Sequence, residues 1–301
     1  MSTTFIKNSI ELSTIKRIIG NIENAKKYLM KTVPDNLPYK VVSKGKNQGN
    51  KVINLADKEI WEAVIKNWDY DKSLLTIREL FTQTNKYKLG KEAIDSLKIL
   101  YNEWDELNFG KIDWPFSQGK FDEFVQRINS QNNDRIEKDN KVKEAAVRYR
   151  RIKEINTLRN DFLETLIFEK NEKILPTLNH IRSVDFYIDG QAYDQKVARS
   201  PTKEFKKKYG ENWKDVAIKN PEIIAEYLYI YQDEGRFGAN PRLLVVYLDE
   251  DLGANEIEQI IKKTDLTNPI EITFTYNHKD VGQKTYKVKC FIILLYKEVD
   301  N

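Results

Sequence analysis

Residues 184–197 read VDFYIDGQAYDQKV, and this stretch decides the fold because it predicts a tight β-hairpin. Asp189 and Gly190 lie at its centre, and an Asp-Gly pair favours a two-residue type I′ turn, in which both residues take a positive φ. Such a turn fixes which residues of the two strands face each other: Ile188 with Gln191, Tyr187 with Ala192, Phe186 with Tyr193, and Asp185 with Asp194. The sequence therefore predicts both the hairpin and its register.

The same register gives the hairpin one charged face and one apolar face, because side chains alternate along a strand. Asp185, Asp194 and Lys196 share the charged face. The apolar face, which suits a core, carries Val184, Phe186, Ile188, Tyr193 and Val197. Like charges directly opposed across two strands destabilise a sheet. We therefore expect a cation between the two carboxylates, and a divalent metal with a lysine beside it would serve.

The composition is that of a globular protein with a well-charged surface. The chain has 301 residues, of which 40% are hydrophobic and 32% charged, and its net charge is +4. A single cysteine, Cys290, excludes a disulfide framework and a thiolate metal site, and two histidines are too few for zinc without carboxylate help. No segment has the apolar length of a membrane span or a leader, so we expect a cytoplasmic protein without membrane attachment.

The first half of the chain is predicted to be mostly helical. Apolar residues recur at three- and four-residue spacing through residues 1–115, and again through 120–172, where the pattern favours two helices. The polar, basic segment 40–52 is typical of an exposed loop. This half therefore predicts a helical region.

The second half predicts a sheet with helices packed on it. RLLVVYLDE at 242–250 is a continuous apolar run, typical of a central strand. Residues 270–276 and 285–296 predict two further strands. The order of elements favours an α/β or α+β fold with a mixed sheet flanked by helices. We divide the chain into a helical region at 1–140 and a sheet-containing domain at 141–301.

The charged face of the hairpin has the groups that metal-assisted phosphodiester cleavage needs. Carboxylates such as those of Asp185 and Asp194 are the hard oxygen ligands that Mg²⁺ prefers. Lys196 can stabilise negative charge that develops on a phosphate. Glu164 and Glu169, on the helix before the hairpin, are possible further acids. The alternative is that the two aspartates and Lys196 form an ordinary surface salt-bridge ladder, and that both glutamates are solvated helix positions.

An acid, a short hairpin and then acid-x-Lys on the next strand resemble the PD-(D/E)xK nuclease superfamily, the restriction-endonuclease-like fold. The resemblance covers residues 144–250. It implies that Asp185 and Asp194 are metal ligands, that the Gln195 carbonyl completes the metal shell, and that Lys196 is the active-site lysine. It also implies that Glu164 is the helix-borne acid and that 141–301 is the catalytic domain, with 1–140 clamping or recognising DNA.

The sequence departs from the pattern of that superfamily at three points. Val184 stands where the motif has proline, and the second acid is aspartate rather than the more frequent glutamate. In addition, only one clear strand precedes the strand that contains Asp194-Gln195-Lys196, the DQK strand. The three-residue motif alone has low specificity, and the hairpin together with the order of elements around it strengthens the resemblance.

Two basic clusters flank the motif and predict contact with the phosphate backbone of DNA. One lies on the helix before the hairpin and the other follows the DQK strand. The candidate DNA-binding residues are Arg148, Arg151, Arg199, Lys203, Lys206 and Lys207. Basic side chains give a sequence-independent affinity for DNA that falls steeply with salt. For any single lysine, a solvated helix face is the competing interpretation.

Together these observations predict a Mg²⁺-dependent endonuclease acting on double-stranded DNA, with Mn²⁺ as a possible substitute, most similar to a site-specific type II restriction enzyme. A homodimer is expected, because each active site cuts one strand and duplex sites are often palindromic. The nearest alternative is a repair, recombination or defence nuclease without sequence specificity. A non-catalytic DNA-binding protein on the same fold is the alternative from another class.

Overall fold

The structure, a computed structural model, describes residues 7, 10–42, 50–110, 118–179, 184–232, 234–249 and 251–297. Its chain divides into two compact units, of which unit 1 comprises Met1–Thr84 and Ile167–Asn301, and unit 2 comprises Asn85–Leu166. The predicted fold class is confirmed: the structure is mixed α/β, with a mixed sheet, flanking helices and a helical N-terminal region. The compact units do not divide at residue 140, and the functional assignment of 1–140 and 141–301 stays a prediction.

The N-terminal part of unit 1 is a group of amphipathic helices. Their bounds are α1 Leu12–Ile19, α2 Ile22–Thr32, α3 Asp57–Lys66 and α4 Tyr70–Thr82. Asn21 and Asp69 cap α2 and α4 by accepting hydrogen bonds from backbone N–H groups of the first turn, which the helix itself leaves without partners. The buried faces of these helices form a core that includes Ile18, Leu29, Val64 and Ile77.

Residues 40–52 were predicted to be a loop, and the ends of this segment instead pair as strands. The strand β1 (Lys40–Val42) runs antiparallel to β2 (Lys51–Ile53), and residues 43–49 between them lie outside the described ranges. Lys40 fixes the start of β1, because its buried ammonium group donates to the carbonyls of Met30 and Val33 and forms an ion pair with Asp35. A buried lysine needs such partners.

Within the described residues, six strands form the main sheet of unit 1, in the order β3-β4-β5-β6-β8-β7. The strands are β3 Ile174–Pro176, β4 Phe186–Ile188, β5 Gln191–Ala198, β6 Arg242–Tyr247, β7 Ile270–His278 and β8 Gly282–Leu295. The pairs β5–β6 and β6–β8 are parallel, and the other pairs are antiparallel. The central position of β6 and the β7–β8 hairpin are confirmed. Pro176 lies in β3, an edge strand, where proline is tolerated.

Three of the four pairs predicted for the hairpin 184–197 form, and the β4–β5 ladder ends before Asp185. Phe186 pairs with Tyr193, Tyr187 with Ala192, and Ile188 with Gln191. Asp189 and Gly190 have φ angles of 49° and 83°, as a type I′ turn requires. The local turn chemistry therefore sets the pairing of β4 and β5.

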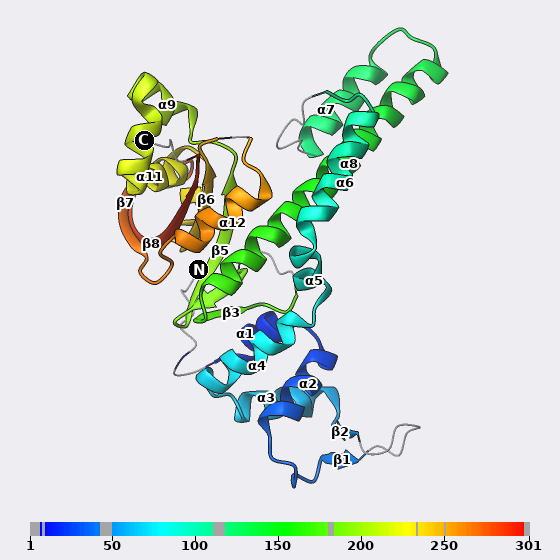
Figure 1. Cartoon of the computed structure of the whole chain (residues 1–301), viewed down its shortest axis with the longest axis vertical. Helices are drawn as coiled ribbons and strands as arrows, with labels where there is room; N and C mark the ends of the chain where they lie inside the picture. Colours follow the sequence, from blue (N-terminus) through cyan, green and yellow to red (C-terminus); the bar gives the residue numbers. More distant parts are fainter. Residues whose placement is uncertain are drawn as a thin grey trace. The chain divides into compact units, whose positions relative to one another are not determined.

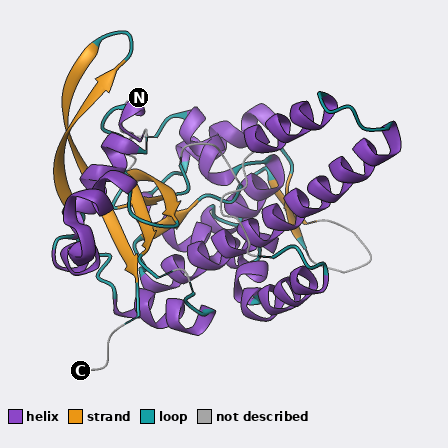
Figure 2. Ribbon diagram, turned by 90° about the horizontal axis from the view of Figure 1, so that it is seen from above, coloured by secondary structure: helices purple, strands orange, loops and turns teal. Residues whose placement is uncertain are grey.

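Helices cover both faces of the sheet (Figure 1, Figure 2). Three of them, α9 (Lys203–Tyr209), α10 (Trp213–Lys219) and α11 (Pro221–Tyr231), pack with the short helix η1 (Gly210–Asn212) against one face. Their core there includes Phe205, Leu228, Leu244 and Val246. The helix α12 (Ala254–Lys263) lies on the other side of the sheet (Figure 1). Thr202 caps α9, so this helix begins two residues after Pro201, which was predicted to open it.

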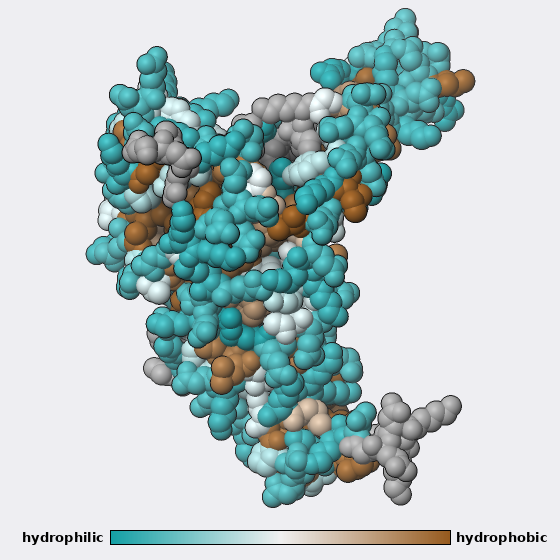
Figure 3. Space-filling view, in the orientation of Figure 1, coloured by the Kyte–Doolittle hydropathy of each residue, from teal (hydrophilic) through white to brown (hydrophobic). Residues whose placement is uncertain are grey.

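Unit 2 consists of α5 (Asn85–Lys91), α6 (Ala93–Glu106), α7 (Gln118–Asn129) and most of α8 (Arg135–Lys170), whose last residues belong to unit 1. The two helices predicted within 120–172 are therefore confirmed as α7 and α8. The surface seen in Figure 3 is largely hydrophilic, with separate apolar patches. Among the residues that the structure describes, no helix combines the length and apolarity needed to cross a membrane.

Arg78 of α4 connects the N-terminal helices of unit 1 to the start of its sheet. Its guanidinium group donates hydrogen bonds to the carbonyls of Phe168, Asn171 and Ile174, at distances of 3.1, 3.1 and 2.8 Å. It also lies 4.0 Å from the centroid of the Phe168 ring. The last carbonyls of a helix have no partner within the helix and form its negative end. Arg78 therefore caps α8 and holds the first residue of β3.

Replacing Arg78 by methionine should lower the free energy of unfolding by about 3 kcal/mol, because charged hydrogen bonds are worth about 1.5–3 kcal/mol each and solvent replaces part of that loss. Urea unfolding followed by circular dichroism measures the change. Lys58→Met is the control, since the Lys58 side chain is 89% exposed. A loss of less than about 1 kcal/mol in Arg78→Met would contradict the capping role.

Candidate functional site

Asp185 lies immediately before β4 and is fixed by its backbone. Its N–H donates to the carbonyl of Tyr193 at 2.9 Å, and its own carbonyl accepts from the backbone and the hydroxyl of Thr177. Its carboxylate oxygen Oδ2 accepts a hydrogen bond of 2.6 Å from the N–H of Gln195. The hairpin therefore holds the Asp185 carboxylate against the backbone next to Asp194. The predicted pair of Asp185 with Asp194 is not part of the β4–β5 ladder, because the Asp185 N–H binds the Tyr193 carbonyl and the Gln195 N–H binds the Asp185 side chain.

Arg242 is the cation that the structure places at these two carboxylates. It is the first residue of β6, it is the parallel neighbour of Asp194 in the ladder, and its guanidinium group forms an ion pair with the Asp194 carboxylate. The Arg242 side chain is 5% exposed and that of Asp194 is 25% exposed. Burial lowers the pKa of Arg242, and the negative charge of Asp185 opposes this shift. Both aspartates therefore act on one buried guanidinium group.

The aromatic ring of Phe237 adds to this environment. Phe237 belongs to the short helix η2 (Glu234–Phe237), and its ring centroid lies 5.9 Å from the Arg242 guanidinium carbon. A cation near an aromatic face is weakly attracted to it. Phe237 and Arg242 were not identified from the sequence, where Arg242 was counted as part of an apolar strand. The available signal was a basic residue at the first position of a strand that is otherwise buried.

Lys196 and Gln195 occupy opposite faces of β5. Lys196 lies on the face of Asp194, beside Leu244 in the ladder, and is half-buried. The side-chain oxygen Oε1 of Gln195 is buried and has no hydrogen-bond partner among the described residues. The backbone N–H of Gln195 is the group that binds Asp185. The predicted role of the Gln195 carbonyl as a metal ligand stays a prediction.

Tyr187 extends the same face of the hairpin toward α1. Burial raises the pKa of its hydroxyl, and the nearby Arg17 partly offsets this shift. Arg17 belongs to α1, so a helix of the N-terminal group contributes positive charge close to the hairpin. The charged face therefore lies near cationic groups from two other elements, β6 and α1.

The donor set fits Mg²⁺ in its number and chemistry. Mg²⁺ in proteins is commonly held by one or two carboxylates and keeps several waters, so Asp185 and Asp194 suffice as protein ligands. Across the described ranges, no group of three or more His, Cys, Asp or Glu side chains could hold a metal. The ion pair with Arg242 involves Oδ2 of the Asp194 carboxylate, so a metal would compete with the guanidinium group for the charge of Asp194. The fit therefore rests on the two aspartates, with Arg242 as a competing cation.

The two further acids lie in different units. Glu164 of unit 2 forms an ion pair with Lys86 of α5, and these side chains are 12% and 14% exposed. Glu169, at the end of α8 in unit 1, is exposed. The role of Glu164 as an active-site acid stays a prediction, and the same holds for Glu169.

The predicted DNA-binding residues also divide between the units. Arg199, Lys203, Lys206 and Lys207 follow the charged part of β5 in unit 1. Lys203 and Lys207 are exposed on α9, whereas the ammonium group of Lys206 lies 4.5 Å from the Trp213 ring centroid. In unit 2, Arg151 forms ion pairs with Glu103 and Glu154, and the Arg148 guanidinium lies 5.6 Å from the Trp104 ring.

The candidate site is defined by the positions and contacts of its own residues. Asp194 and Lys196 of β5 share one face of the mixed sheet with Arg242 of β6, and the Asp185 carboxylate is bound to the backbone N–H of Gln195 between them. No protein-family model matches this chain, and neither does any curated protein or solved structure.

Proposed function

We propose that this protein is a Mg²⁺-dependent endonuclease that hydrolyses phosphodiester bonds of double-stranded DNA at specific sequences, with Mn²⁺ able to replace Mg²⁺. The observation that carries the proposal is the hairpin, in which Asp185 lies against the backbone beside Asp194 and Lys196 follows on the same face. Carboxylates with an adjacent lysine are suited to hold a divalent ion next to a phosphate.

Each residue of the charged face has a role in this proposal. Asp185 and Asp194 would hold the metal, which when bound supplies Lewis acidity and lowers the pKa of a coordinated water. Lys196 would stabilise the negative charge that develops on the scissile phosphate. The exposed lysines of α9 and Arg199 would bind neighbouring backbone phosphates, which position the duplex without reading its sequence.

The order of elements also supports the proposal. The helix α8 is followed by β3, then by the strand next to Asp185, then by the strand with Asp194 and Lys196, and after the helices α9–α11 by β6. In the sequence, only the stretch 176–183 was a candidate for a further strand before β4, and β3 (Ile174–Pro176), paired antiparallel with β4, is a strand at the start of that stretch. The resemblance to the PD-(D/E)xK superfamily remains part of the proposal.

The ion pair between Asp194 and Arg242 favours a second candidate, a DNA-binding protein on the same fold that does not cut. A buried guanidinium group can neutralise two carboxylates permanently, and removal of either partner would then leave an uncompensated buried charge. In the catalytic alternative, Arg242 pairs with Asp194 only until a metal binds. A nuclease without sequence specificity is the third candidate, because the backbone contacts are sequence-independent.

Two further properties belong to the proposal. We propose a homodimer, because two copies of one active site would cut both strands of a palindromic duplex site. A cytoplasmic location is proposed because duplex DNA of the cell or of an invading element is accessible there.

Incubation of the protein with plasmid and Mg²⁺ should give discrete fragments, and Asp194→Asn and Lys196→Ala should each lower the cleavage rate by about 100-fold or more, in the range of lost electrostatic stabilisation. Asp189→Asn is the matched control, because it removes one charge from the turn of the same hairpin and asparagine tolerates the positive φ. Gel electrophoresis over time measures the rates. A smear would indicate a non-specific nuclease, and intact plasmid would contradict nuclease activity.

Arg242→Met tests whether a metal and the guanidinium group compete for the same carboxylates. Without metal, the variant should lose about 3 kcal/mol of stability, the low end for a broken buried pair, because the partly buried Asp194 carboxylate loses its partner. If the site binds metal, Mg²⁺ at about 10 mM should raise the melting temperature of Arg242→Met by several degrees more than that of the wild type. A ligand that binds only the native state stabilises it in this way when its concentration exceeds the dissociation constant.

The double variant Asp194→Asn/Arg242→Met is the control, because it removes both charges of the pair. It should be more stable than Arg242→Met and should not respond to Mg²⁺. If Mg²⁺ raises the melting temperature of none of the three proteins, Arg242 is a permanent structural cation and the non-catalytic candidate is favoured.

A further inference from the structure

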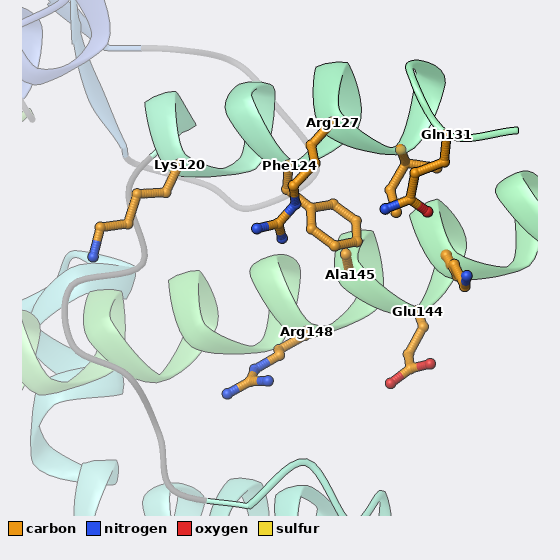
Figure 4. A pocket seen from close by; sticks show the side chains of 9 residues that line it. Lys120, Phe124, Arg127, Gln131, Glu144, Ala145 and Arg148 are labelled. Carbon is orange, nitrogen blue, oxygen red and sulfur yellow. The ribbon is translucent and has the colours of Figure 1, made fainter.

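Unit 2 contains a groove between α7 and α8 that the nuclease motif does not involve. Its volume is about 560 Å³. Phe124 and Arg127 reach from α7 toward α8, Lys120 lies at one end, and Glu144 and Arg148 lie along α8 (Figure 4). Phe121 of α7 and Tyr149 of α8 stack with their ring centroids 5.5 Å apart, so the two helices are packed together beside the groove.

The groove concentrates the positive charge of the helical hairpin. Residues 118–150 contain eight basic and six acidic side chains. The groove is lined by four of these basic residues (Lys120, Arg127, Lys141 and Arg148) and by one acid, Glu144. The remaining surface of the hairpin therefore has four basic and five acidic side chains. A solvated surface would not be expected to collect the cations on one side, so the groove suits a polyanion.

The ion pairs of the groove leave it able to bind phosphates. Lys141 pairs with Glu137 at 2.7 Å, but the two side chains are 41% and 49% exposed, and exposed pairs of this kind are weak. Arg127 is exposed and lies 5.5 Å from the Phe124 ring centroid. A phosphate can therefore replace Glu137 at Lys141 and can bind Arg127 while the arginine still contacts the ring.

An aromatic ring among cations favours a single strand over a duplex. Unpaired bases stack on aromatic side chains, whereas the bases of a duplex are already stacked on one another. The volume of about 560 Å³ is in the range of small-ligand sites and suits one or two nucleotides rather than a double helix. Phe124 is half-buried and lines the groove, so an unpaired base can reach its ring.

We infer that the α7–α8 groove binds a single strand of nucleic acid, with backbone phosphates on Lys120, Arg127 and Lys141 and an unpaired base against Phe124. This inference deepens the proposed function, because it adds a preference for DNA that contains a single-stranded stretch. It does not depend on cleavage, since none of the groove residues belongs to the hairpin 184–197.

Fluorescence anisotropy of the full-length protein with a labelled 20-nucleotide oligothymidylate, in EDTA, tests the inference without cleavage. Lys120→Gln/Arg127→Gln should weaken binding by 10-fold or more, and should reduce the slope of log affinity against log salt by about 1.4, since each phosphate contact on a single strand contributes about 0.7. Phe124→Leu should weaken single-strand binding about 10-fold and leave the affinity for a matching 20-base-pair duplex unchanged.

The matched control is Arg135→Gln/Lys143→Gln, which removes the same charge from exposed positions of the same hairpin outside the groove. It should change single-strand affinity less than 2-fold. Three results would overturn the inference. The control could lose as much single-strand affinity as the groove variant, Phe124→Leu could weaken duplex and single-strand binding equally, or a polyglutamate peptide could bind as tightly as the oligonucleotide. Because this binding assay in EDTA involves no cleavage and the plasmid assay measures cleavage alone, failure of the nuclease proposal and failure of this inference are distinguishable.

Discussion

One buried guanidinium group, that of Arg242, balances the charges of two aspartates that flank a tight turn in unit 1. The Asp-Gly turn fixes the register of β4 and β5, and this register brings Asp185 to the backbone next to Asp194. Two carboxylates in a partly buried position repel each other and need a cation nearby. Arg242 provides it from the adjacent parallel strand, so the electrostatic requirement of the hairpin and the pairing of β5 with β6 are linked.

This arrangement limits what the site can do chemically. A guanidinium group and a divalent ion would compete for the negative charge of Asp194, whose oxygen Oδ2 forms the ion pair with Arg242. If Arg242 moved when a metal bound, the Phe237 ring and a phosphate of the substrate are the groups that could receive its charge. In the proposed function, cleavage requires that metal and DNA together outweigh the ion pair, and the non-catalytic candidate corresponds to an ion pair that they do not outweigh.

The sequence predicted the local features of this site and missed the non-local ones. The hairpin register follows from the two residues at its centre, and the central strand follows from a run of apolar residues. Both features could therefore be predicted from local sequence. The parallel pairing of β5 with β6 joins residues almost 50 positions apart, and no local pattern specifies it. Arg242 could therefore not be assigned to Asp194. The ion pair of Glu164 with Lys86 was missed for the same reason.

The separation of charges within the chain bears on how it would recognise DNA. Its net charge of +4 is small, so affinity for a polyanion must come from local clusters rather than from the whole molecule. One cluster, on α9, follows the strand of Lys196, and the other lines the α7–α8 groove around an aromatic ring. The first has the exposed lysines that suit any phosphate backbone, and the second has a ring that suits an unpaired base. Because these clusters share no residues with the aspartate pair, the proposed binding and the proposed cleavage depend on different residues, and the failure of one proposal does not imply the failure of the other.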